Sequence, residues 1–81
     1  MDQASIKELD KILPVVARVH GDQHPELEEV KKLYEQLKAS PDKAAAERLK
    51  DVTHDFTLPE DACPAYEKTY RHLSAMVKEI I

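Results

Sequence analysis

The segment ELEEVKKLYEQL, residues 26–37, decides the fold that we expect. Its apolar residues recur at spacings of three and four, which places them on one face of an α-helix and leaves the charged residues on the other. Pro25 suits the first turn of a helix, and the glutamates at the start complement the positive end of the helix dipole. The sequence therefore predicts a helix over residues 25–39, capped by Asp22 or His24. The residues expected to be buried are Leu27, Val30, Leu33, Tyr34 and Leu37.

The preceding segment, residues 4–20, has the same helical period. Pro14 removes one backbone donor inside it, so we expect a kink or a restarted helix there. Gly21 follows, and as the one glycine of the chain it is expected to end the helix in the left-handed conformation. The core-facing residues of this helix are expected to be Ile6, Leu9, Leu13, Val16 and Ala17.

A third and a fourth helix are expected over residues 41–53 and 58–80. Ser40 and Pro41 form a suitable cap and first-turn residue for the third helix, which has a small apolar face. That face consists of Ala45, Leu49 and Val52.

The fourth helix is expected to begin at a capping box, in which the side chains of Thr57 and Glu60 satisfy each other's backbone donors. Pro64 falls inside this range, and the alternative is that the stretch before Ala65 forms a separate turn. Together the four segments predict an all-α fold, a small bundle of three to four short helices in one domain over residues 1–81. The core-facing residues of the fourth helix are expected to be Tyr66, Tyr70, Leu73, Val77 and Ile80.

The composition limits the possible functions. With 42% hydrophobic residues the 81-residue chain is too apolar to be disordered, and with one glycine it is unlike a turn-rich β-protein. The net charge is −4 and neither half of the chain is basic, so we expect no nucleic-acid partner. No apolar run approaches the roughly 20 residues that span a bilayer, and the polar N-terminus does not resemble a signal peptide. A single cysteine fits a reducing compartment, so we expect a cytoplasmic protein with no membrane association.

The histidines are the first candidates for chemistry. His20 and His24 are four residues apart and allow two interpretations: a metal-binding pair, or one histidine closing a helix and the other capping the next. His24 and Glu28 have the spacing that would place both on one helical face. Two ligands do not make a metal centre, because the di-iron centres of helical bundles draw ligands from four helices. From these residues we expect no catalytic residue and no cofactor.

The remaining candidates have simpler interpretations. His54 is expected in a solvated turn, and His72 at the edge of the apolar face of the last helix. Cys63 has no histidine or second cysteine near it in the sequence, so we expect a buried or inert thiol. The three tyrosines are expected to be core aromatic residues with hydrated hydroxyls.

Two stretches resemble a known family when they are taken together. LPVVARVHGDQHPELEEVKKLYEQL, residues 13–37, resembles the first helical hairpin of the iron–sulfur cluster repair di-iron proteins, which are hemerythrin-like. LKDVTHDFTLPEDACPAYEKTYRHL, residues 49–73, resembles a later stretch of the same family, where one helix ends and the last begins. The resemblance implies a four-helix bundle around an oxo-bridged di-iron centre. Family members are bacterial and cytoplasmic and are linked to the repair of iron–sulfur clusters damaged under stress.

The chain departs from that family at every ligand segment. The first-helix ligand would lie before Met1 and the last ligand segment after Ile81, and residues 42–47 read DKAAAE without a histidine. No histidine matches a family ligand, so none is assigned a ligand role. Without metal ligands the apolar faces can close on each other as an ordinary core.

The function that the sequence predicts is therefore a shortened, hemerythrin-like relative of the cluster-repair family, without its own di-iron site. It would be a non-catalytic accessory or interaction module in iron or stress handling, and not an enzyme. A homodimer or a larger protein partner is expected, because so short a chain has few residues for a core. The alternatives are a non-functional remnant and an iron-binding repair protein whose site is assembled across a homodimer. The candidate ligands for that site are His20, His24, Glu28 and His72.

Overall fold

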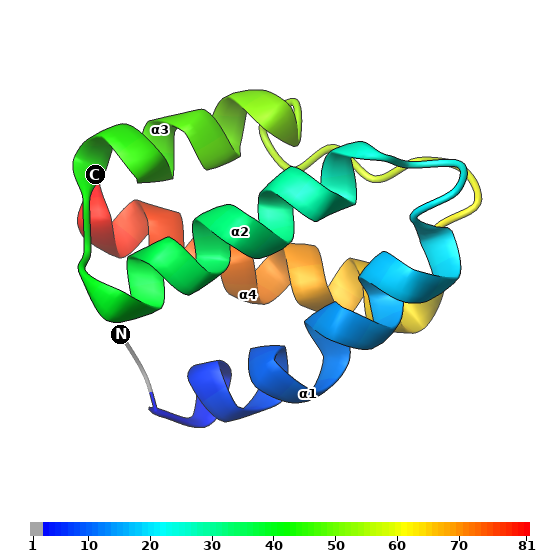
Figure 1. The fold of residues 1–81 in the computed structure, drawn as a ribbon, viewed down its shortest axis with the longest axis horizontal. Coiled ribbons are helices and arrows are strands. Elements are labelled where there is room, and N and C mark those ends of the chain that lie inside the picture. The colour runs from blue at the N-terminus through cyan, green and yellow to red at the C-terminus, as the bar shows by residue number, and fades with distance from the viewer. Residues whose placement is uncertain (1–2) are drawn as a thin grey trace.

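Four α-helices make up the fold in the computed structural model, which describes residues 3–81 (Figure 1). The helices are α1 (Gln3–His20), α2 (Glu26–Ala39), α3 (Lys43–Val52) and α4 (Pro64–Ile80). Each packs against two others, in the order α1–α2–α3–α4 and back to α1. The predicted all-α bundle is confirmed. The α1–α2 connection and the long connection before α4 lie together at one end of the bundle, on the right of Figure 1.

Helix α1 continues through Pro14 without a break. Its ribbon changes direction near its middle, so the proline bends the helix rather than restarting it (Figure 1). The apolar face is continuous on both sides of Pro14, because Leu9, Leu13 and Val16 are all buried. This packing holds the two halves together despite the lost backbone donor.

The predicted left-handed conformation of Gly21 is wrong, since no glycine has a positive φ in the structure. Glycine is required there for a different reason: an added Cβ would collide with the carbonyl oxygen of Ala17. The chain leaves α1 through a tight turn in which the backbone N–H of His24 donates to the carbonyl of His20 at 2.8 Å.

The predicted starts of the second and third helices are also corrected. Neither Asp22 nor His24 caps α2; the N-cap position is held by Pro25 and has no side-chain hydrogen bond. Ser40 ends α2 instead of starting α3, because its N–H donates to the carbonyl of Gln36. Asp42 caps α3 by accepting a hydrogen bond from the N–H of Ala44 at 3.1 Å.

Helix α4 begins at Pro64 and not at residue 58, so the predicted capping box is not formed. The Thr57 hydroxyl instead donates to the carbonyl of His54 at 2.7 Å. The alternative, a separate turn before Ala65, is confirmed. A proline is tolerated at the first helical position but would break a helix that ran through it from residue 58, which explains the later start.

The reversal after α3 is built from three successive left-handed residues: His54, Asp55 and Phe56 have φ values of 53°, 58° and 60°. This conformation is unfavourable for residues with a Cβ, so other contacts must hold it. The buried Thr53 supplies two of them, because its hydroxyl donates to the Leu49 carbonyl at 2.8 Å and accepts from the Phe56 N–H at 3.1 Å.

The interior of the bundle is mainly apolar and also contains three tyrosines and two threonines, Thr53 and Thr69. Most of the predicted core is buried, while Ile6, Val52 and Ile80 are only partly buried. The Tyr34 hydroxyl reaches the edge of the core and donates to Asp10 at 2.8 Å. The buried hydrophobic residues are Leu9, Leu13, Val16, Ala17, Leu27, Val30, Leu33, Tyr34, Leu37, Ala45, Ala46, Leu49, Tyr66, Tyr70, Leu73, Met76 and Val77.

Among residues 3–81, the helices are all too short or too polar to cross a membrane.

Leu13→Ala should destabilise the protein by about 3 kcal/mol, because Leu13 is fully buried at the centre of the core and its removal leaves a cavity. Urea unfolding followed by circular dichroism measures the change. Leu58→Ala is the matched control, because Leu58 is 39% exposed and should cost no more than about 1 kcal/mol. Equal losses in the two variants would contradict this assignment of the core.

Candidate functional site

Four ionisable side chains that pair with one another across the fold lie where the two connections meet. His20 ends α1, His24 follows in the α1–α2 connection, and Asp61 and Cys63 lie just before α4. Tyr66, in the first turn of α4, lies between the two histidines. These five residues are called the end cluster below.

Cys63 and His20 form a hydrogen-bonded pair. The Sγ atom of Cys63 lies 3.2 Å from Nε2 of His20, and both residues are partly buried. Cys63 is the N-cap residue of α4, in extended backbone conformation, and its side chain makes no capping hydrogen bond. The sulfur is therefore turned to the imidazole, so that a nucleophile and a base lie within hydrogen-bonding distance.

His24 is held by carboxylates on both sides. Its Nε2 donates to the two oxygens of Asp61, at 3.0 and 3.2 Å, and its Nδ1 lies 3.5 Å from Glu26. The hydrogen bond from His24 is the main cause of a lowered pKa for Asp61. This contact links the two connections across the end of the bundle.

Tyr66 separates the two histidines and begins a chain of aromatic rings. Its ring meets those of His20, His24 and Tyr70 edge-on, with centroids 5.1, 5.8 and 5.0 Å away. The hydroxyls of Tyr66 and Tyr70 are 3.4 Å apart, and burial is the largest cause that raises the pKa of each. Both therefore remain neutral phenols at physiological pH.

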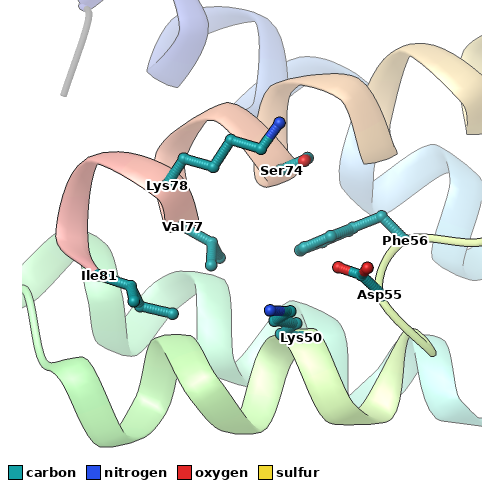
Figure 2. A pocket seen from close by; sticks show the side chains of 7 residues that line it. All are labelled: Lys50, Asp55, Phe56, Ser74, Val77, Lys78 and Ile81. Atoms are coloured by element: carbon teal, nitrogen blue, oxygen red, sulfur yellow. The ribbon is translucent and has the colours of Figure 1, made fainter.

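Hollows lie along the connection before α4. One, of about 270 Å³, lies beside the end cluster and is lined by His24, His54 and Tyr66 among others. The second, of about 190 Å³, lies between α3 and α4 (Figure 2). Phe56 points into it between Lys50 and Ser74, and Val77 forms part of its apolar wall.

The structure does not bring the candidate metal ligands together. His20 and His24 belong to the end cluster but have different partners, and Glu28 is exposed on α2. His24 precedes α2, so it shares no helical face with Glu28. His72 lies on α4 and its Nδ1 is 3.1 Å from the Ser5 hydroxyl. Within residues 3–81, no three histidine, cysteine, aspartate or glutamate side chains converge closely enough to hold a metal ion.

Sequence reasoning missed both hydrogen-bonded pairs of the end cluster. Cys63 lies 43 residues from His20, and Asp61 lies 37 residues from His24. No spacing rule relates residues so far apart, because their contact depends on how the helices pack. The one available signal was Pro64, whose preference for the first helical position would have placed Cys63 at the helix N-cap. The prediction that His20 closes a helix is confirmed, as is the core position of the three tyrosines.

Comparisons with protein-family models, with curated proteins and with solved structures found no significant match to this chain.

Asp61→Asn should destabilise the protein in a pH-dependent way. The folded protein holds the pKa of Asp61 below its unfolded value, so its contribution to stability is present above about pH 5 and is lost as the pH falls below about 4. The free energies of unfolding of wild type and variant should therefore differ near neutral pH and converge in acid. Urea unfolding at a series of pH values measures this, with the exposed Asp22→Asn as the control. A difference between the two free energies of unfolding that stays constant down to pH 2 would contradict this prediction.

Proposed function

We propose that this protein is a shortened relative of the iron–sulfur cluster repair family that serves as a non-catalytic interaction module in iron or stress handling in the cytoplasm. The proposal rests on the two stretches, residues 13–37 and 49–73, that resemble that family. The first covers the C-terminal part of α1 and most of α2, and the second runs from the end of α3 into α4. These helices pack against one another as neighbours in a four-helix bundle, which is the arrangement that the resemblance implies.

The observation that carries the proposal is the filling of the bundle axis. Leu9, Leu27, Leu49 and Leu73 come from four different helices, and each is 0% exposed. In di-iron bundles the inward positions of the four helices carry glutamates and histidines instead. A leucine core favours packing without a central metal. The function of the bundle would then lie in what its outer surface binds.

Exposed apolar side chains on α1 support an interaction role. Val15 is 44% exposed and Val19 is 63% exposed, and residues four apart lie on the same face of a helix. We propose that this face is covered by a second copy of the chain or by a larger protein. A chain of 81 residues buries a modest share of its surface, so covering these valines would add stability.

Protein purified from iron-rich medium should carry far less than one iron per chain, measured by elemental mass spectrometry, and should show no oxo-bridge absorption band. It should also fail to restore a purified enzyme whose iron–sulfur cluster has been damaged. Iron at one equivalent or more that is lost in His24→Ala and kept in the exposed His54→Ala would contradict the proposal. That result would favour the iron-binding alternative, with a site shared across a homodimer. Repair activity without bound iron would contradict both.

If the exposed face of α1 with Val15 and Val19 is covered by a second copy, the protein should self-associate at micromolar concentration. Light scattering coupled to gel filtration measures its molar mass. Val19→Lys should shift the protein to the monomer, because a charge on the apolar face opposes its burial. Ala75→Lys places the same charge on an exposed position of α4 and should leave the dimer intact. A wild-type protein that is monomeric and retains no larger partner would contradict the interaction role.

A further inference from the structure

We propose that Cys63 is a reactive thiol that exchanges with disulfides of low molecular weight, with His20 as the base that removes its proton. This proposal is independent of the function proposed above. It starts from the 3.2 Å contact between the Cys63 Sγ and the His20 Nε2. A thiol and an imidazole at this distance can pass one proton between them and form a thiolate–imidazolium pair.

The positions of both residues at helix ends favour that charge-separated form. Cys63 lies at the N-terminus of the 17-residue helix α4, where a negative charge is stabilised by the helix dipole. His20 is the last residue of the 18-residue helix α1, where a positive charge is stabilised. The two helix ends meet, so each dipole favours the charge that proton transfer would place beside it.

The surrounding groups are compatible with the pair. The other titratable residues of the end cluster are His24, Asp61 and Tyr66, and Tyr66 remains neutral and meets the His20 ring edge-on. The Asp61 carboxylate is engaged by His24, and the charge of His20 also contributes to its lowered pKa. Asp61 therefore places a negatively charged carboxylate near both histidine rings.

The reaction is a thiol–disulfide exchange. Nε2 of His20 takes the proton from Cys63, and the thiolate attacks one sulfur of the disulfide, forming the mixed disulfide and breaking the original bond. The departing thiolate takes up the proton from the imidazolium and leaves as a thiol. Atoms and electrons balance, because one disulfide and one thiol are consumed and one disulfide and one thiol are formed.

The product has no second cysteine to resolve it, because Cys63 is the single cysteine of the sequence. The modified state would persist until a thiol from outside the chain reverses it. Cys63 is thus suited to reversible modification and not to the formation of an internal disulfide.

The test is the rate of reaction with an aromatic disulfide, 5,5′-dithiobis(2-nitrobenzoic acid), at pH 6, where an ordinary thiol is almost fully protonated. Folded wild-type protein should react at least about tenfold faster than the same protein unfolded in urea, because only the folded state has the pair. His20→Gln should lose this advantage, and its rate should rise about tenfold per pH unit as an ordinary thiol does. His72→Gln removes a different partly buried histidine and should keep the wild-type rate. Oxidised glutathione, followed by mass spectrometry, should give one adduct.

The proposal is overturned if folded wild-type protein reacts no faster at pH 6 than unfolded protein. This comparison uses wild-type protein alone and needs no variant. It is equally overturned if His20→Gln, folded by circular dichroism, keeps the wild-type rate and pH profile. If His20→Gln fails to fold, the comparison of folded and unfolded wild-type protein decides the matter.

Discussion

Burial of leucine side chains contributed by all four short helices is the interaction on which the rest of this structure depends. Each fully buried leucine contributes roughly 1.5–3 kcal/mol, and a domain this small has few such contributions with which to offset the entropy of folding. Leu13, Leu37, Leu49 and Leu73 have no exposed surface and come from all four helices. A charged group at one of these positions would need a partner in the same volume, which this core does not contain.

Two hydrogen-bonded pairs of ionisable side chains lie at one end of the bundle. There the connections have access to solvent and the helix dipoles provide fields of both signs. His24 and Asp61 join the two connections, while His20 and Cys63 join the end of α1 to the start of α4. The end cluster therefore links the helices and also holds the reactive side chains. A substitution in it can change both reactivity and the free energy of unfolding, so both have to be measured.

The resemblance to cluster-repair proteins and the chemistry of the end cluster are separate lines of argument. The first rests on two sequence stretches and on the order of the helices, and a bundle of this kind supports many functions. The second rests on atomic contacts at Cys63 and His20 that hold whatever the family. Either proposal can therefore fail without the other.

The sequence by itself determined the type and order of the helices and limited their number to three or four, because the 3.6-residue period of apolar side chains is a local property. Leu27, Val30, Leu33, Tyr34 and Leu37 were predicted to be buried, and they are. Only the tertiary structure decided where three helices begin and which polar groups meet. Thr57 forms no capping box because α4 begins at Pro64, and its hydroxyl donates to the His54 carbonyl instead. His24 does not cap α2, and its ring binds the distant Asp61. The contact between Cys63 and His20 spans 43 residues, so it exists only after α1 and α4 have packed side by side.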